Sequence, residues 1–334
     1  MNFYTLLKLN NKIKSPNIKL IGILILHYFN KRYRSVRIDP ILSCNLFCRM
    51  CYFSSMEQRK KMKGQIPQTE FKYIASTLFP SALQVFIGCG AEPTTHRGYM
   101  EIIQLAKNYK VPNVGMVTNG QLLTKKDIED LIELQLDELT ISTHGVKKST
   151  YEHFMVNAKY DRFLENLDWL LELKEEKGLT KPDIRINYTV NTDNLDELKD
   201  FFSIFSRYQI STLQIRPVLN IGGKYSQGLR DDQIPIYNDL INQFKTICKE
   251  KNIRLLANTT DVTYNKENKN LKVANSIYCY IGPNTSKQYN FDWSSVTYSE
   301  FIKKTRWKKE LFQSLFNRFD SKLNKGVTNY EVFE

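Results

Sequence analysis

The chain has 334 residues, 42% of them hydrophobic and 25% charged, with a formal net charge of +13. This length can bury a sizeable core in one large or two moderate domains, and the composition is that of a globular protein. A disulfide framework is excluded, because three of the six cysteines crowd into positions 44–51 while the others stand alone. Thiols so close together are typical of metal ligands in a reducing compartment, which predicts a cytoplasmic protein.

The first 35 residues are predicted to be a basic, partly apolar extension. Residues 1–34 carry seven basic side chains and no acid, more than half of the excess charge. Such a stretch is typical of a segment that binds an anionic lipid surface, a nucleic acid or an acidic peptide. It is also typical of a solvated helix that packs on the main domain. Its apolar run, 20–26, precedes basic residues instead of a cleavage site and is far shorter than the roughly 20 residues of a membrane span. We therefore expect neither a secretory signal nor a transmembrane segment.

Residues 36–220 are predicted to form the core domain, because short β-rich runs alternate there with stretches of helical period. Thr124 and Asp127 resemble a capping box at the start of one helix, and Gly178 ends another. Six βα units predict an α/β fold, a partial (β/α)6 TIM-like barrel, since eight units close a full barrel. The six strands are expected at residues 36–42, 83–88, 114–118, 138–142, 184–190 and 212–217.

Residues 221–334 are predicted to be a small C-terminal α+β extension. They contain a loop with several glycines at 222–228, a helix near 240–247, a strand at 253–257 and a polar, Asn-rich stretch. This change of pattern marks the expected boundary near residue 220.

The segment Cys44-Asn-Leu-Phe-Cys48-Arg-Met-Cys51 carries the strongest chemical signal. It follows the first predicted strand, where barrel enzymes keep their reactive groups. A cubane cluster has four irons, so three thiolates leave one iron able to bind a small chelating molecule. Zinc is the alternative, and would need a fourth ligand such as His96 or His144.

This segment resembles the CxxxCxxC hallmark of the radical S-adenosylmethionine (SAM) superfamily. The resemblance implies one 4Fe-4S cluster on Cys44, Cys48 and Cys51, with the amino and carboxylate groups of SAM on the open iron. It also implies that an electron from the cluster breaks the sulfonium bond and that a 5'-deoxyadenosyl radical removes a substrate hydrogen. Relatives commonly have an aromatic residue before the last cysteine, which covers the adenine. Here Met50 takes that place and should pack similarly.

The residues after the second predicted strand look like the Gly-Gly-Glu element of the superfamily. Glu92 is thereby implied to hold the methionine amino group, and Gly90 to let the backbone approach the cofactor closely. Ala91 replaces the usual last glycine, so the backbone path there is expected to differ slightly.

Later strand ends are similar to the superfamily as well. The resemblance implies that Ser142 contacts the ribose or the methionine carboxylate, and that Arg216 is an anion partner near the adenine. Asn194 matches an asparagine of many relatives, or is simply a helix cap. His144 stands where Asp is common, and a lone histidine is more often structural than catalytic. Met155 occupies the place of an arginine that grips the carboxylate in many relatives.

Residues 279–317 faintly resemble the C-terminal extension called SPASM or twitch, in which a cysteine precedes a short hairpin and a helix. That extension normally holds auxiliary clusters on several cysteines, whereas only Cys279 is present, with Cys248 upstream. We therefore expect a degenerate extension without an auxiliary cluster. Cys89 and Cys248 are expected to be small buried apolar side chains.

The SPASM-like tail and the basic leader favour a radical SAM enzyme that modifies a peptide or protein. The alternatives are oxidation or rearrangement of a small molecule such as a sugar or amino acid, RNA modification, and a non-enzymatic cluster-binding protein. A flavodoxin- or ferredoxin-like protein is the expected electron donor. A nucleic acid is not an expected partner, because no separate RNA-binding module follows the barrel. No residue is assigned to the step on the substrate.

Overall fold

The computed structural model describes residues 12–13, 15–218, 221–225, 227–258, 271–316 and 331–333. The chain forms two compact units that alternate along the sequence. Unit 1 comprises residues 1–42, 64–116 and 267–327, and unit 2 comprises residues 43–63, 117–266 and 328–334. The predicted extension 1–35 belongs to unit 1, and its residues 1–11 and 14 lie outside the described residues.

The strands of unit 1 are parallel and hydrogen-bonded in the order β8-β1-β2-β3. In register, Val36 lies beside Val85 on one side and Cys279 on the other. Most residues of β2 are buried, as expected for a parallel strand covered on both faces. The bounds are β1 Arg34–Ile38, β2 Ala82–Ile87, β3 Asn113–Thr118 and β8 Tyr278–Ile281.

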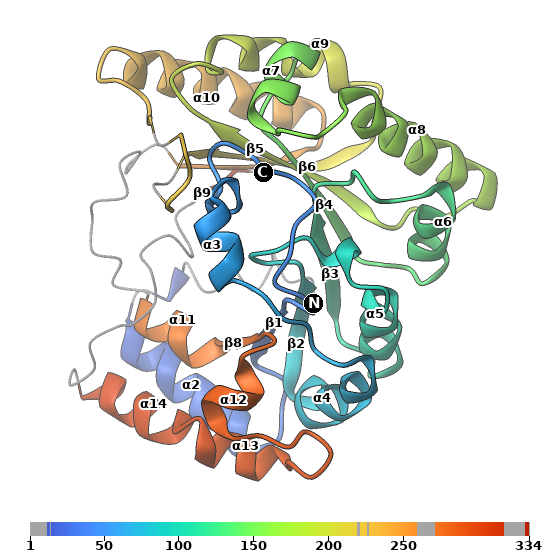
Figure 1. The fold of residues 1–334 in the computed structure, drawn as a ribbon. Helices are drawn as coiled ribbons and strands as arrows, with labels where there is room; N and C mark the ends of the chain where they lie inside the picture. The colour runs from blue at the N-terminus through green and yellow to red at the C-terminus, as the bar shows by residue number, and fades with distance from the viewer. Residues whose placement is uncertain are drawn as a thin grey trace. The chain divides into compact units, whose positions relative to one another are not determined.

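The helices of unit 1 form two groups. In one, α4 packs against α5, and both lie along β2 and β3 (Figure 1). In the other, α2 packs against α11 and α14, and α14 packs against α13. The bounds are α2 Pro16–Tyr28, α4 Phe71–Leu78, α5 Tyr99–Asn108, α11 Leu271–Ile277, α12 Thr285–Tyr289, α13 Tyr298–Lys304 and α14 Trp307–Leu315, with short 3-10 helices at Gln68–Glu70, Phe79–Ser81 and Pro93–Thr95.

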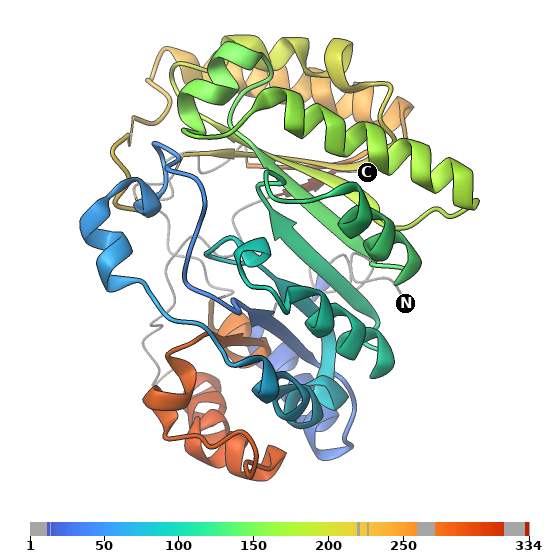
Figure 2. The same ribbon diagram turned by 45° about the vertical axis from the view of Figure 1, so that its right-hand side comes forward.

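The strands of unit 2 are ordered β4-β5-β6-β7-β9, and all are parallel except β9, which runs antiparallel to β7. The helices α8 and α10 lie on one side of β5 and β6 (Figure 2). The strands are β4 Glu138–Thr143, β5 Asp183–Val190, β6 Ile210–Pro217, β7 Arg254–Ala257 and β9 Glu331–Phe333. The helices are α3 Met56–Lys61, α6 Lys125–Glu133, α7 Lys148–Phe154, α8 Tyr160–Lys177, α9 Phe201–Phe205 and α10 Gln233–Glu250, with 3-10 helices at Tyr52–Ser54 and Asp196–Asp200.

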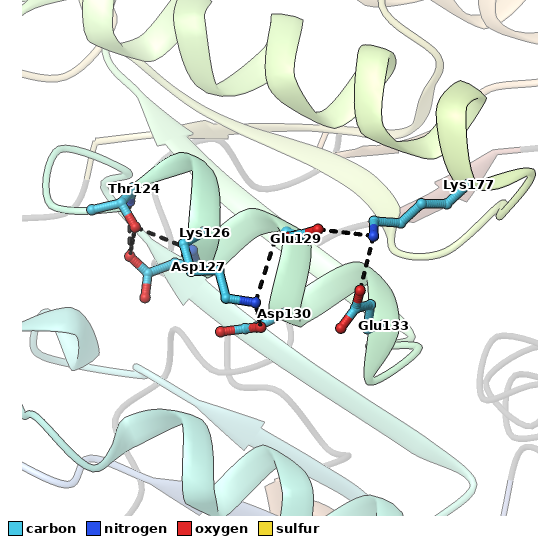
Figure 3. Close-up of polar contacts among 7 residues, drawn as sticks. All are labelled: Thr124, Lys126, Asp127, Glu129, Asp130, Glu133 and Lys177. Atoms are coloured by element: carbon cyan, nitrogen blue, oxygen red, sulfur yellow. Dashed lines mark hydrogen bonds and ion pairs between the residues drawn. The ribbon is translucent and has the colours of Figure 1, made fainter.

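The predicted helix signals of unit 2 are confirmed. Thr124 and Asp127 form both hydrogen bonds of a capping box at the start of α6. Gly178 ends α8 in the left-handed conformation, with φ of 61°. Figure 3 shows how Lys177, the last residue of α8, forms ion pairs with Glu129 and Glu133 of α6, at 2.9 and 2.8 Å. These pairs are partly exposed, so the packing of α6 on α8 rests mainly on the buried apolar faces.

All six predicted core strands are present, and their ends agree within two residues except for the first. That strand was expected at 36–42 but spans Arg34–Ile38. It ends because Pro40 has no N–H for the ladder and because the side chain of Asp39 turns to the backbone of Cys89 and Gly90. The early end of β1 lets the chain leave the sheet before the cysteine segment.

Residues beyond 220 add strands to both units. β7 pairs in parallel with β6, and β8 pairs in parallel with β1. Buried Cys279 lies in β8, and α12 follows this strand where the SPASM resemblance suggested a hairpin. The domain boundaries at 35 and 220 stay predictions. None of the helices that the structure describes is long and apolar enough to cross a bilayer.

Candidate active site

The three clustered cysteines lie in unit 2, on the segment that leads into α3. Cys48 is buried, and Cys44 and Cys51 are half-buried. The Cys51 N–H donates to the Cys48 carbonyl oxygen at 2.9 Å, which makes the second half of the segment a tight turn. The Cys44 sulfur accepts from the Leu46 N–H at 3.4 Å and from the Asn119 amide at 3.7 Å. Such donors favour the ionised form of a thiol, which is the form that binds iron.

The donor set fits an iron-sulfur cluster. Burial raises the pKa of the Cys51 thiol, while the Phe53 N–H and the charge of Arg59 act in the opposite direction. No three His, Cys, Asp or Glu side chains within the described parts of the chain converge on one metal-binding point. A cubane does not require such convergence, because each thiolate binds a different iron. Three soft thiolates are the ligands that such clusters prefer.

One of the two histidines considered as a fourth zinc ligand, His96, is not available to bind a metal. In unit 1, the His96 Nδ1 accepts from the Gly98 N–H at 3.0 Å, and its Nε2 lies 3.0 Å from the Ile66 carbonyl oxygen. Both ring nitrogens are therefore engaged with the backbone. His96 has a structural role.

Arg59 of α3 holds the cysteine segment from both sides. Its Nη1 donates to the Cys44 carbonyl oxygen at 2.9 Å and its Nε to the Phe53 carbonyl oxygen at 2.6 Å. Nη2 donates to the Leu46 carbonyl oxygen, and the guanidinium lies 3.6 Å from the centre of the Phe47 ring. One cation thus binds the start of the cysteine segment and the backbone just after it. Sequence reasoning missed this residue, because nothing in its spacing signals the contact.

Met50, within the cysteine segment, is buried against the chain that follows β6. It packs with Phe154, Val218 and Tyr225, and its sulfur lies 3.3 Å from the Asn191 amide nitrogen. The Tyr225 N–H donates to the Arg49 carbonyl oxygen at 2.9 Å. The backbone chain 221–225 therefore covers this part of the segment. The contact of Met50 with adenine stays a prediction.

Gly223 is where that chain comes closest to the cysteine segment. A Cβ atom at Gly223 would lie 2.6 Å from the Met50 carbonyl carbon and 2.8 Å from the Arg49 carbonyl oxygen. Both are backbone atoms that cannot swing away, so only glycine fits here. The sequence predicts a glycine-containing loop here but gives no sign of this contact.

Asn194 joins the ends of β4 and β5. Its amide nitrogen donates to the carbonyl oxygens of His144 and Thr189, both at 2.9 Å, and its amide oxygen accepts from the Asn191 N–H at 2.7 Å. The alternative of a helix cap is not observed, because Leu195 precedes the next helical turn. Contact of Asn194 and of half-buried Ser142 with SAM stays a prediction.

His144 and Arg216 influence each other at the ends of β4 and β6. Burial lowers the pKa of His144 to about 4, and the charge of Arg216 acts in the same direction. The imidazole is therefore neutral at neutral pH. Its buried Nδ1 has no hydrogen-bond partner among the described residues, which leaves a polar atom for a bound molecule. The predicted role of Arg216 as an anion partner stays a prediction.

The Gly-Gly-Glu-like loop belongs to unit 1, and Asp39 organises it. The Asp39 carboxylate accepts from the N–H groups of Cys89 and Gly90 at 2.7 and 3.2 Å and from the Tyr280 hydroxyl at 2.8 Å. Its burial raises the pKa of this carboxyl group. The role of Asp39 was not predicted from the sequence, although an acid followed by proline at a strand end is a signal that could have indicated it.

The two isolated cysteines differ in exposure. Cys89 is exposed, so the expectation that it is buried was wrong, whereas Cys248 is buried as expected.

Glu92 is buried at the start of a 3-10 helix. Its Oε1 accepts from the Thr94 N–H at 3.2 Å and the Thr94 hydroxyl at 2.7 Å. These bonds fix the carboxylate as the N-cap of that helix. Contact of Gly90, Ala91 and Glu92 with SAM stays a prediction.

The sequence profile of the Radical SAM superfamily matches residues 38–203, which contain the cysteine segment. The chain belongs to the radical SAM superfamily. Radical SAM proteins use a 4Fe-4S cluster and SAM, and this chain is accordingly a radical SAM enzyme.

Relatives and solved structures agree with this assignment. The "Probable GTP 3',8-cyclase" of Saccharolobus solfataricus is 25% identical over 230 residues, covering 68% of this chain and 71% of the relative. Streptococcus suis SuiB bound to S-adenosylmethionine has a TM-score of 0.61 at 15% identity, over 78% of this chain and 61% of SuiB. SuiB with its precursor peptide SuiA has a TM-score of 0.54 at 14% identity, over 92% of this chain and 66% of that chain. The chain thus spans less than two thirds of SuiB, and the likeness confirms the predicted partial TIM-like radical SAM fold.

Proposed function

We propose that this radical SAM enzyme reductively cleaves SAM at a 4Fe-4S cluster held by Cys44, Cys48 and Cys51, and modifies a peptide or protein. The cysteine segment itself is the observation that supports the first part of this proposal, the cleavage of SAM at a cluster. The Cys44 sulfur receives hydrogen bonds from the Leu46 N–H and from Asn119, and Arg59 ties the two ends of the segment together. A chain segment held in this way is preorganised to receive a cluster.

The cofactor supplies the chemistry that the side chains lack. When bound, the cluster provides one electron that cleaves SAM into methionine and a 5'-deoxyadenosyl radical, which takes a hydrogen atom from the substrate. The protein binds, orients and shields the reactants from water. We assign the adenine side to Met50 and Arg216, the ribose or methionine carboxylate to Ser142, and a further contact with SAM to Asn194.

The residues of the Gly-Gly-Glu-like loop complete the assignment. Gly90 and Ala91 would offer backbone, and Glu92 would accept from the methionine ammonium. Neutral His144, with its open Nδ1, is a further hydrogen-bonding group toward a bound molecule.

Two considerations support a peptide substrate. SuiB, whose fold this chain shares, has been solved with its precursor peptide SuiA bound. The net charge of +13 also favours an acidic partner. The second candidate is a small molecule, because the Saccharolobus relative carries the name of a GTP cyclase. We further propose a flavodoxin- or ferredoxin-like electron donor, an overall oxidoreductase reaction and a cytoplasmic location, which suits a cluster on reduced thiols.

The substrate class is tested by the yield of 5'-deoxyadenosine. The reconstituted enzyme is incubated anaerobically with SAM and dithionite, together with either GTP or each short acidic peptide encoded beside its gene. A peptide substrate raises the yield above the substrate-free level, and deuterium placed on that peptide appears in 5'-deoxyadenosine. Stimulation and label transfer by GTP alone would replace the peptide proposal with the nucleotide one.

A further inference from the structure

Helix α2 of unit 1 carries an apolar stripe that faces solvent. Ile18, Ile21 and Ile25 are 60%, 48% and 51% exposed. Tyr28 and Phe29 continue the stripe at the C-terminal end of the helix, and both are exposed. Residues spaced three and four apart share one face of a helix, so these five side chains form one continuous surface. We call it the α2 stripe.

The opposite face of α2 fixes the helix to unit 1. Leu20 and Ile23 are buried there. His27 lies with its ring centre 4.7 Å from that of Trp307, and its Nδ1 is 3.1 Å from the Tyr33 hydroxyl oxygen. The helix is therefore apolar on both faces but covered on one. Exposed apolar surface of this kind marks an interaction site.

Helix α14 lies next to the α2 stripe. It packs beside α2 (Figure 1), and Phe312 and Phe316 at its C-terminal end are exposed. Lys308 of α14 places its ammonium group 5.1 Å from the centre of the Tyr28 ring. A cationic group therefore adjoins the stripe, and exposed aromatic side chains lie on the same neighbouring helix.

The charge around the α2 stripe is positive. Residues 12–34 contain no acid. Lys12 and Lys31 are exposed before and after the helix, and Lys308 and Lys309 are exposed on α14, where Glu310 is the acidic residue. A partner of this surface must therefore offer apolar area together with negative charge.

We propose that the α2 stripe and its lysines dock the enzyme onto an anionic phospholipid surface. A short helix with Ile, Tyr and Phe on its outward face and lysines at its borders has the composition of a helix that lies in a membrane interface. At 13 residues it cannot span the bilayer. A second copy of the chain is a poorer occupant, because two-fold pairing would bring the same positive charges face to face. The proposal is independent of the substrate.

Vesicle sedimentation of the reconstituted full-length enzyme tests the proposal. Vesicles of phosphatidylcholine alone are compared with vesicles that also contain phosphatidylglycerol. We expect binding to the anionic vesicles, weakened as salt is raised. Ile21→Ser with Ile25→Ser should lower the affinity at least about tenfold, because two apolar side chains lose their burial in lipid. Lys31→Gln with Lys308→Gln should lower the affinity and flatten its salt dependence.

A matched control shows whether the loss of binding is specific to the stripe or follows from replacing any exposed isoleucine. Ile236→Ser changes an equally exposed isoleucine of α10 in unit 2, and should leave binding unchanged. Circular dichroism and SAM cleavage show that the stripe variants are folded. Absence of binding to anionic vesicles at low salt, or equal binding by the stripe variants, would overturn the proposal. So would a solution dimer of the wild type that Ile21→Ser with Ile25→Ser converts to monomer, because the stripe would then bind a second copy.

Discussion

The guanidinium of Arg59 donates to the carbonyl oxygen of Cys44, at 2.9 Å. The same side chain donates to the carbonyl oxygens of Leu46 and Phe53, so the start of the cysteine segment and the backbone just after it are tied to one cation. A hydrogen bond from a charged group contributes about 1.5–3 kcal/mol. The cysteine segment is thus held in shape by a residue that is not itself a ligand.

Arg59→Ala should reduce the iron retained after anaerobic reconstitution and accelerate cluster loss to a chelator. It should also lower the free energy of unfolding by about 2–3 kcal/mol. Arg59→Lys should recover only part of the loss, because an ammonium lacks the planar fork that reaches three carbonyls. Exposed Lys60 on the same helix is the matched control, and Lys60→Ala should behave as wild type. Equal iron content and chelator resistance in Arg59→Ala would show that the contact is dispensable.

Asp39→Ala should destabilise the Gly-Gly-Glu-like loop, because it leaves the N–H groups of Cys89 and Gly90 without their acceptor. We expect a loss of about 1–3 kcal/mol in the free energy of unfolding and faster amide exchange at those two positions. Asp39→Asn keeps an oxygen acceptor and should cost less. Amide exchange measured by mass spectrometry reports on the loop directly, and unchanged exchange in Asp39→Ala would refute the role given to this carboxylate.

Gly223→Ala should push the chain after β6 away from the cysteine segment. The new methyl group would overlap the Met50 backbone, which costs about 1–3 kcal/mol of stability and should weaken SAM binding. Gly228 provides the control, since a Cβ there meets no atom within 4 Å. Thermal unfolding and calorimetric titration with SAM should therefore separate the two alanine variants. Indistinguishable variants would mean that the close approach at Gly223 has no consequence.

We expect the free energy of unfolding to fall in acid, in part because His144 takes up a proton on unfolding. Its pKa is lowered to about 4 in the folded chain, whereas an unfolded histidine takes up its proton near 6.5. Between these values the unfolded state binds more protons, so His144 favours unfolding as pH falls from about 6.5 toward 4. Urea unfolding across that range should show a smaller loss of stability for His144→Gln than for wild type. Parallel pH profiles would contradict the burial of a neutral imidazole.

The features that could be predicted from the sequence are those that depend on a local pattern of residues. Alternating β-rich and helical runs located the strands, and the Thr124–Asp127 capping box and Gly178 located helix ends. The cysteine spacing identified the superfamily because the chemistry requires that spacing. These features depend on residues a few positions apart.

Contacts between distant residues could not be predicted in this way. Asp39 meets Cys89 and Tyr280 across 50 and 241 positions, and Gly223 meets Met50 only once both chain segments are folded. The C-terminal strand β8 pairs with β1 for the same reason, since a parallel neighbour leaves no local signature in a short apolar run. Exposure of Cys89 was missed because an isolated cysteine is usually buried.

Cluster content and SAM cleavage in two complementary cysteine variants show whether Cys44, Cys48 and Cys51 hold the cluster. Cys44, Cys48 and Cys51 are replaced together by alanine in one variant, and Cys89 and Cys248 in the other. Anaerobic reconstitution of wild type and of the second variant should give about four irons per chain and, with dithionite, 5'-deoxyadenosine from SAM. The first variant should show neither iron nor cleavage. If it instead keeps its iron and cleaves SAM while the second variant loses both, the cluster is held elsewhere and the account of this site is wrong.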